Sequence, residues 1–250
     1  MASLRTELTT SLTRLRLPSF RASFEHLARQ AELEKWTYEQ YLLALSEQEC
    51  QDRDVNRRQR YLQESGLPSG KRLENFERLR LSRRLNQHIE ALLTGDFLAR
   101  SENVLAFGNP GSGKTHLLSG IGHELIQQGY RVFFASCALF VQDLLRAKAE
   151  LKLAKHFKRL SKYDCIILDD LGYVQQSQDE MEVLFSFFAE RYERGAVMIS
   201  SNLPFSAWDQ IFKNPMVTAA AVDRLVHHSV ILELNLPSYR AEQAQKKQVN

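Results

Sequence analysis

Residues 108 to 115 form a glycine-rich loop of the kind that holds the phosphates of a nucleoside triphosphate. They read Gly108-Asn109-Pro110-Gly111-Ser112-Gly113-Lys114-Thr115, a complete G-x-x-x-x-G-K-T pattern. Glycines let backbone N–H groups turn inward around phosphate oxygens, and the lysine reaches the β- and γ-oxygens. The threonine hydroxyl is a ligand for Mg²⁺. We therefore expect a nucleoside triphosphate with Mg²⁺ at this loop, with His116 completing the binding residues.

Two carboxylates follow a second apolar run. The run Cys165 to Leu168 ends in Asp169 and Asp170, about 55 positions after the loop. A strand that carries acids at its end, beside a phosphate loop, places one acid to hold Mg²⁺ through water. We expect Asp169 to have this role and Asp170 to orient or deprotonate the attacking water. The alternative is that the two acids cap the next helix.

Two more polar side chains are candidates for catalysis. Asn202 follows the apolar run 196–200 and can position the γ-phosphate, although an Asn in such a turn also commonly satisfies backbone groups. Arg224 lies in a helical stretch, residues 222–228. An arginine supplied by a neighbouring subunit raises phosphoryl-transfer rates by about 10³–10⁵. The alternative is an exposed Asp223–Arg224 pair on a surface helix.

The elements that must position these residues alternate between strand and helix from about residue 101. Continuous apolar runs predict strands covered on both faces, and apolar residues recur at helical spacing after the loop, so a helix N-terminus faces the phosphates. We therefore expect an α/β domain with a mostly parallel five-stranded sheet. The expected strands are 103–107, 131–135, 163–168, 196–200 and 230–234.

The first hundred residues have helical periodicity throughout, with three or four helices expected and a turn near residues 66–70. We expect an all-α N-terminal domain over residues 1–75 that binds DNA or a partner, and the nucleotide-binding domain over residues 76–250. The cysteines, Cys50, Cys137 and Cys165, have no metal-ligand spacing and are expected to be structural.

Charge is distributed unevenly, although the net charge is only +3. Residues 53–84 hold ten Lys and Arg against four acids, and residues 146–162 hold seven against one. Such surfaces bind nucleic-acid phosphates through counterion release, and no recognition helix is evident, which favours non-specific contact with the backbone of duplex DNA. The alternative is a solvated helix face. Within the first zone, we select Arg57 and Arg58 as DNA contacts.

Nothing in the sequence predicts a membrane partner. No apolar run approaches the roughly 18 residues that a bilayer requires, and the N-terminus has no apolar segment followed by a small-residue cleavage site. We therefore expect a cytoplasmic protein.

Taken together, these elements resemble the AAA+ ATPases, in the branch of the DnaC helicase loaders and the IstB-like transposition helper ATPases. Besides the loop, the matching strings are ILDDLG at 167–172, ISSNLPF at 199–205 and AVDRLVHH at 221–228. The N-terminal Leu15-Arg16-Leu17-Pro18 and the connector from Gly66 to Phe76 also resemble the IstB-type leader.

This resemblance implies an ATPase whose subunits assemble with ATP on duplex DNA, as a ring or a spiral. It implies that Asn202 senses the γ-phosphate and that Arg224 acts on the neighbouring subunit's nucleotide. It also implies a helper that selects or remodels target DNA and recruits a transposase. In this branch a helix after the second strand faces the axis of the assembly, so the resemblance places Lys148, Lys152 and Lys155 at the DNA.

The sequence departs from the family pattern in two places. Many AAA+ proteins have Glu where this chain has Asp170, and the shorter side chain favours slow hydrolysis that DNA or a partner stimulates. Residues 235–250 are too few for a helical lid, which leaves Arg240 as a candidate second sensor.

Three other functions stay open on the sequence alone. A DnaC-type helicase loader shares every catalytic residue and differs in residues 1–75. A small-molecule P-loop kinase requires an acceptor-binding lid with clustered arginines, for which the chain has no obvious candidate. A module that binds ATP and DNA without hydrolysis is the third.

Overall fold

The computed structural model describes residues 2–172, 177–208, 215–239 and 242. The chain divides into two compact units, Met1–Arg60 and Tyr61–Asn250. This boundary lies earlier than the one predicted after residue 75. The reason is apolar packing, because Tyr61, Leu62 and Leu67 contact the buried core of the second unit.

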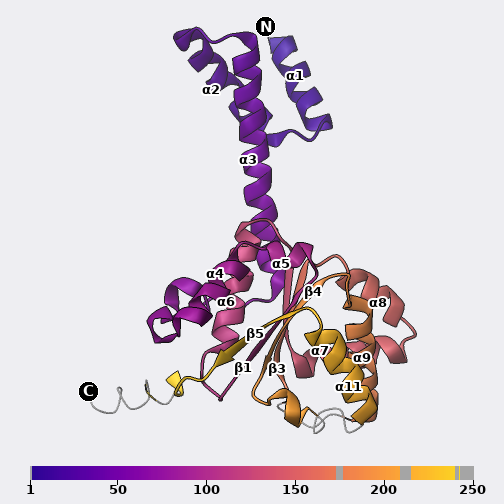
Figure 1. Cartoon of the computed structure of the whole chain (residues 1–250). Coiled ribbons are helices and arrows are strands. Elements are labelled where there is room, and N and C mark those ends of the chain that lie inside the picture. The colour runs from indigo at the N-terminus through magenta and orange to yellow at the C-terminus, as the bar shows by residue number, and fades with distance from the viewer. Residues whose placement is uncertain (1, 173–176, 209–214, 240–241, 243–250) are drawn as a thin grey trace. The chain divides into compact units, whose positions relative to one another are not determined.

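The first unit is helical, as its periodicity predicts. Its helices are α1 (Ala2–Arg14), α2 (Pro18–Glu34) and α3 (Tyr38–Ser65), the last of which continues into the second unit (Figure 1). Helix α2 begins at Pro18, a first-turn position that suits proline. No side chain of α2 caps its start; instead Glu49 of α3 accepts the N–H groups of Ser19 at 2.9 Å and Phe20 at 3.4 Å.

The second unit is built on a five-stranded sheet in which every neighbouring pair is parallel. The strands are β1 (Asn103–Gly108), β2 (Val132–Ser136), β3 (Cys165–Leu171), β4 (Ala196–Ser201) and β5 (Ser229–Leu234). All five were predicted, with ends that differ by a few residues. Their order is β2-β3-β4-β1-β5, so the carboxyl ends of β1, β3 and β4 meet at one edge, where open α/β sheets bind ligands.

Helices cover both faces of this sheet, which explains the continuous apolar strands. In Figure 1, α4 and α6 lie on one side, and α7, α9 and α11 lie on the other. Each side has its own buried apolar cluster. The helices are η1 (Leu73–Asn75), η2 (Arg78–Arg80), α4 (Arg83–Leu93), α5 (Asp96–Ala99), α6 (Lys114–Gln127), α7 (Cys137–Ala149), α8 (Leu153–Leu160), α9 (Gln178–Arg191), η3 (Phe205–Ala207) and α11 (Pro215–Val226).

A buried arginine fixes the starting ends of two strands. Arg191, the last residue of α9, donates hydrogen bonds to the carbonyl oxygens of Tyr163 (2.9 Å), Asp164 (3.2 Å) and Ala196 (3.0 Å). These carbonyls lie just before β3 and at the start of β4. Its buried neighbour Cys165 carries a neutral thiol, because burial raises the pKa of that group to about 12. Cys137 is also buried, whereas Cys50 is exposed.

None of the helices in the described part of the chain combines the length and the apolar character that a membrane span requires.

Candidate nucleotide-binding site

The glycine-rich loop connects β1 to α6, and its backbone requires two of its glycines. Gly111 has φ +81° and Gly113 has φ +99°, a region that residues with a side chain rarely adopt. A Cβ atom on Gly113 would lie 2.9 Å from the Phe76 ring, and one on Gly111 would collide with Ser238. The loop therefore keeps a curled backbone that neighbouring segments contact closely.

The interior of this loop has the polar groups that a phosphate needs. Lys114 is 6% exposed, and its ammonium donates to the carbonyl oxygens of Gly108 (2.8 Å) and Asn109 (3.0 Å). The buried Ser112 hydroxyl has no hydrogen-bond partner among the described residues. Because a buried polar group without a partner is costly, an anion with several acceptor oxygens fits this cradle.

The two carboxylates lie where β3 departs from regular pairing with β4. Leu168 pairs with Ile199 and Leu171 pairs with Ser201, so three steps along β3 match two along β4. The extra residue is a β-bulge, a feature that re-aims side chains. Asp170 at this bulge has φ +60° and an exposed side chain, whereas Asp169 is buried.

Ser200 of β4 forms hydrogen bonds with both acidic residues. No functional role was predicted for it from the sequence. Its hydroxyl donates to Asp169 Oδ1 at 2.5 Å and accepts the N–H of Asp170 at 2.8 Å. In the sequence, Ser200 is only a small residue at the end of an apolar run. The signal that would have found it is the pairing of this strand end with the strand that carries the acids.

Burial raises the pKa of Asp169, and the charge of Asp170 raises it further. Hydrogen bonds from the hydroxyls of Ser200 and Thr115 and the charge of Lys71 act in the opposite direction without cancelling the increase. A hydroxyl beside a carboxylate is a donor set that suits Mg²⁺. No cluster of three His, Cys, Asp or Glu side chains occurs among the described residues, so a cation here would also need phosphate oxygens and water.

A cavity of about 220 Å³ brings together most of the predicted site residues, although Gly108, Asn109 and Asp169 are not in its lining. Its walls include the loop from Pro110 to His116 together with Asp170 and Asn202. The remaining wall comes from residues that had no predicted role in nucleotide binding: Lys71, Asn75, Phe76, Glu77, Arg80, Leu236 and Tyr239. His116 contacts this wall, because its ring meets Phe76 edge to face at 5.3 Å and its Nε2 atom lies 2.8 Å from the Arg72 carbonyl oxygen.

Arg224 is not among the residues that line this cavity. Its guanidinium carbon lies 4.6 Å from the centre of the Phe185 ring of α9. One terminal nitrogen of Arg224 is buried and has no hydrogen-bond partner among the described residues. Its action on a neighbouring subunit stays a prediction, and Arg240 lies outside the described residues.

A second cavity, of about 690 Å³, lies in the basic segment between α7 and α8. The cations that line this basic groove are Arg146, Lys152, Lys155, Lys158, Arg159 and Lys162. Lys148 is not among them; its ammonium pairs with Glu182 of α9 at 3.0 Å. Of the three lysines expected at DNA, Lys152 and Lys155 line the groove and Lys148 does not. Lys152 is also ion-paired, with Glu150 at 2.8 Å.

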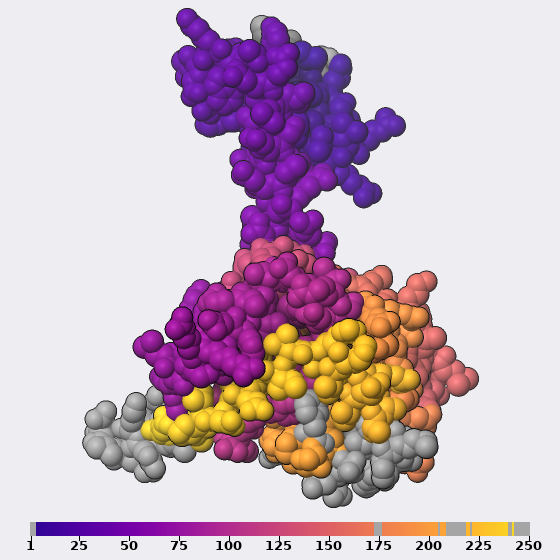
Figure 2. Space-filling model, viewed as in Figure 1, coloured from indigo at the N-terminus to yellow at the C-terminus, as the bar shows by residue number. Residues whose placement is uncertain are grey.

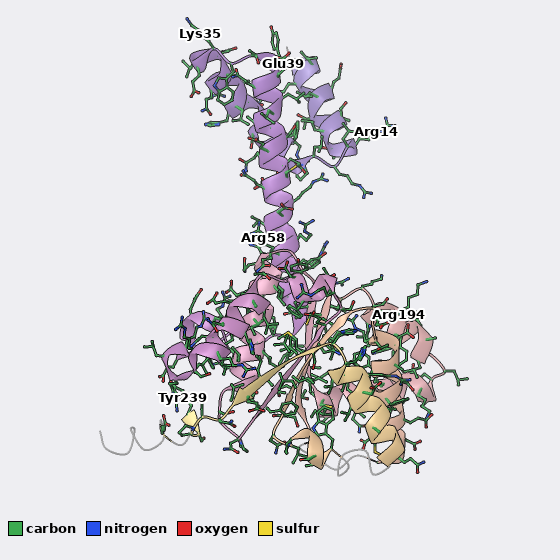
Figure 3. The ribbon with its side chains drawn as sticks, viewed as in Figure 1. Arg14, Lys35, Glu39, Arg58, Arg194 and Tyr239 are labelled. Atoms are coloured by element: carbon green, nitrogen blue, oxygen red, sulfur yellow. The ribbon has the colours of Figure 1, made fainter. Side chains whose placement is uncertain are left out.

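The two arginines of α3 that were predicted as DNA contacts differ in their surroundings. Arg57 is exposed and pairs with Asp54 at 2.8 Å. Arg58 is half-buried and is labelled in Figure 3. Both belong to the first unit, and their contact with DNA stays a prediction.

The chain is similar to proteins of bacterial insertion sequences. A family model described as IstB-like ATP binding protein matches residues 10–247. An insertion sequence ATP-binding protein of Sinorhizobium fredii is 43% identical over 234 residues, covering 93% of this chain and 78% of that protein. The ATP-binding protein of insertion sequence IS21 from Pseudomonas aeruginosa is 31% identical over 243 residues, covering 96% and 91%.

Solved structures share the fold of about two thirds or more of this chain. The crystal structure of the DnaC helicase loader aligns with a TM-score of 0.55 at 18% identity, covering 66% of this chain and 97% of that one. AMPPCP-bound DnaA from Aquifex aeolicus aligns with a TM-score of 0.55 at 20% identity, covering 74% and 56%. These likenesses confirm the predicted α/β P-loop core preceded by helices.

Proposed function

We propose, since the chain belongs to the IstB-like ATP-binding protein family, that it is an ATP-dependent assembly factor for the transposition of an insertion sequence. It is an ATPase with the AAA+ fold. In our proposal its subunits assemble with ATP on duplex DNA, select or remodel the target, and recruit a transposase. The observation that carries the proposal is the single cavity that joins Lys114, Asp170 and Asn202.

The proposed site residues have separate roles in ATP hydrolysis. The loop N–H groups and the Lys114 ammonium bind phosphate oxygens, with Lys114 exchanging its two carbonyl partners for them. Thr115 and Asp169 would hold Mg²⁺, which would neutralise charge that develops on the phosphates. Asp170 accepts a proton from the attacking water at a carboxylate oxygen, and Asn202 orients that water.

Slow hydrolysis follows from the short side chain of Asp170. Its side chain is one methylene shorter than that of a glutamate, so its carboxylate holds the attacking water less closely. A change that compresses the site would bring the carboxylate and this water closer together. Binding of DNA or of a partner is the event that we expect to supply this compression. Slow turnover keeps the ATP-bound assembly on DNA long enough for a transposase to engage it.

DNA contact is assigned to the basic groove. Lys155, Lys158 and Arg159 are exposed there, and no ion pair involving them is found among the described residues. Exposed cations without acidic partners gain most from meeting phosphates, since they lose no existing pair when they bind. Contact with the backbone alone carries no sequence information, which suits a helper that accepts many targets.

Hydrolysis in the assembly needs Arg224 of the neighbouring subunit. The absence of Arg224 from its own cavity supports this role, and so does its buried terminal nitrogen, for which the described part of the chain supplies no hydrogen-bond partner. In the proposal, the Phe185 ring positions the guanidinium, which contacts the neighbour's γ-phosphate, where an arginine stabilises transition-state charge.

The test is ATPase activity of purified protein with and without duplex DNA, together with Lys114→Ala and Arg224→Ala. Arg194→Ala is the matched control, since Arg194 is an exposed arginine that pairs with Glu190 outside the cavity. Lys114→Ala should abolish ATP binding. Arg224→Ala should bind ATP normally and lose DNA-stimulated hydrolysis, whereas Arg194→Ala should behave as the wild type.

Mixed assemblies test action between subunits. Lys114→Ala subunits, which retain Arg224, should restore hydrolysis to Arg224→Ala subunits, which retain an intact loop. Full activity of Arg224→Ala in a protein that stays monomeric with ATP would contradict the proposal. Binding to a replicative helicase without any response to DNA would replace it with the helicase-loader function.

A further inference from the structure

The residues after β5 form a strap along the phosphate loop, defined here as residues 235–239. The N–H of Tyr239 donates to the carbonyl oxygen of Gly111 at 3.0 Å. Ser238 lies so close to Gly111 that a Cβ atom there would collide with it. Leu236 packs against the buried cluster below α4 and α6. The strap is therefore attached both to the loop and to the core.

Arg80, at the end of η2, holds the strap from the other side through three contacts. Its guanidinium donates to the Pro237 carbonyl oxygen at 3.4 Å and pairs with Glu242 at 2.7 Å. It also lies 5.7 Å from the centre of the Tyr239 ring. The Glu242 N–H donates to the Ser238 carbonyl oxygen at 3.1 Å. Figure 2 shows the yellow atoms near the C-terminus against the purple surface of the segment around residue 80.

These contacts surround one part of the nucleotide cavity. Phe76, Arg80, Leu236 and Tyr239 all line it, together with the phosphate loop. The loop fixes the triphosphate, so the base and ribose must occupy the part of the cavity that the loop does not form. Phe76 and Tyr239 supply aromatic rings there, and aromatic faces bind the flat face of a base. Arg80, with its side chain 21% exposed, sits between this wall and Glu242.

We propose that the strap is the base-side wall of the nucleotide site, and that the Arg80–Glu242 pair sets the rate at which nucleotide leaves. This inference rests on the proposed function, because it assigns a role to residues around the same cavity. Arg80 is a positioning residue: it holds Tyr239 in place. When the Arg80–Glu242 pair breaks, Tyr239 swings away from the cavity and the base is released.

A surface ion pair with no role in binding would behave differently. Such a pair contributes little to stability and nothing to ligand exchange. The Arg80–Glu242 pair instead holds the strap, which contacts the nucleotide cavity through Tyr239 and the phosphate loop through Gly111. Nucleotide release is therefore the property that distinguishes the two interpretations.

The experiment measures dissociation of a fluorescent ATP analogue from the full chain, chased with excess ATP. Glu242→Gln removes the charge and keeps the shape. It should speed dissociation by about twofold to fivefold, the range expected for a partly exposed pair. Glu190→Gln is the matched control, because it breaks the exposed Arg194–Glu190 pair on α9.

Inorganic tripolyphosphate separates this inference from the proposed function. It has no base, so its affinity should fall in Lys114→Ala and stay unchanged in Glu242→Gln and in Tyr239→Leu. Tyr239→Phe, which keeps the ring, should release the analogue at the wild-type rate. An unchanged rate in Glu242→Gln would overturn the inference while leaving the function intact. A loss of tripolyphosphate affinity in Tyr239→Leu would overturn it too, since the strap would then act on the phosphate loop. A wild-type protein that binds no ATP would contradict both the inference about the strap and the proposed function.

Discussion

The Ser200 hydroxyl donates a hydrogen bond of 2.5 Å to Asp169. The same oxygen accepts the N–H of Asp170 at 2.8 Å. One fully buried side chain of β4 thus contacts both acids: Asp169, for which we propose cation binding, and Asp170, for which we propose contact with the attacking water. The spacing between these two functions is set by the neighbouring strand as well as by the strand that carries them.

Ser200→Ala should raise the Mg²⁺ concentration that half-saturates ATP hydrolysis by about 10–100-fold, the usual cost of losing a residue that orients a metal ligand. Titrating Mg²⁺ at saturating ATP measures this change. Ser201→Ala is the control, because Ser201 is equally buried but its hydroxyl donates to main-chain carbonyls. An equal effect in both variants would mean that general destabilisation, and not Asp169, is responsible.

The pH dependence of Mg²⁺ binding should follow Asp169. Burial raises the pKa of this carboxyl in the folded protein, and only the ionised form binds the cation. Apparent Mg²⁺ affinity should therefore fall as pH decreases through this raised pKa. Ser200→Ala removes a hydrogen bond that lowers the pKa, so the fall should begin at higher pH. Identical pH profiles for the two proteins would contradict this assignment.

Glu49 should make the stability of the first unit fall at low pH, although its pKa is shifted in the opposite direction to that of Asp169. Burial of this carboxyl raises its pKa, but hydrogen bonds from Arg53, Ser19 and Phe20 outweigh burial and lower it overall. Its contribution is therefore present above the unfolded pKa of about 4.5 and is lost as pH falls through the lower folded value. Glu49→Gln should cost about 1–2 kcal/mol at pH 7 and less at pH 4.

Hydrogen exchange measured by mass spectrometry on peptides from α2 checks this prediction, with wild type and Glu49→Gln compared at the same pH. Glu47→Gln serves as the control, since Glu47 lies on the same helix and no hydrogen bond of its side chain is found among the described residues. A difference between wild type and Glu49→Gln that is as large at pH 4 as at pH 7 would show that the carboxylate charge is not involved.

DNA binding should distinguish the lysines of the basic segment. Lys155→Ala and Lys158→Ala should each weaken binding to all duplexes and lower the salt slope by about 1. Lys148→Ala should change binding little, because its ammonium already pairs with Glu182. Fluorescence anisotropy of a labelled duplex, over a range of salt concentrations and with a non-hydrolysable ATP analogue, measures the slopes. A larger loss of DNA affinity in Lys148→Ala than in Lys155→Ala would contradict the assignment of DNA contact to the basic groove.

Phe185→Leu should weaken the proposed action of Arg224 on the neighbouring subunit's ATP, because the Phe185 ring contacts the Arg224 guanidinium. Removing an aromatic face below a guanidinium costs about 0.5–2 kcal/mol, and the freed side chain should sample other positions. DNA-stimulated hydrolysis should fall by about threefold to tenfold while ATP affinity stays constant. Phe185→Tyr should retain activity because it keeps the ring. Loss of ATP affinity in Phe185→Leu would mean that the change disturbs the core between α9 and α11 instead.

Local patterns in the sequence predicted the phosphate loop, the five strands and the acids after β3. Each depends on residues adjacent in the chain: glycines that permit a curled backbone, apolar runs covered on two faces, and carboxylates that end a strand. The placement of Asp170 and Asn202 beside Lys114 also followed, because parallel strands bring their carboxyl ends to one edge.

The features that could not be predicted join distant parts of the chain. Ser200 acts on residues 30 positions earlier, and Lys148 pairs with an acid 34 positions later. Arg80 meets Glu242 across 162 positions. Each of these contacts depends on how helices and loops pack after the sheet has formed, and neither spacing nor periodicity encodes that packing.

The bulge at Asp170 limits which acid can serve at this position. Its positive φ angle is tolerated by short polar residues such as Asp and Asn, and less well by longer side chains. Glutamate would extend the carboxylate toward the substrate but would adopt this backbone at a cost, whereas asparagine would suit the backbone and lose the base. Aspartate at this position therefore balances a backbone preference for positive φ against the length of the side chain that carries the carboxylate. If Asp170 is the base that we propose, the backbone conformation at this residue limits the rate of ATP hydrolysis.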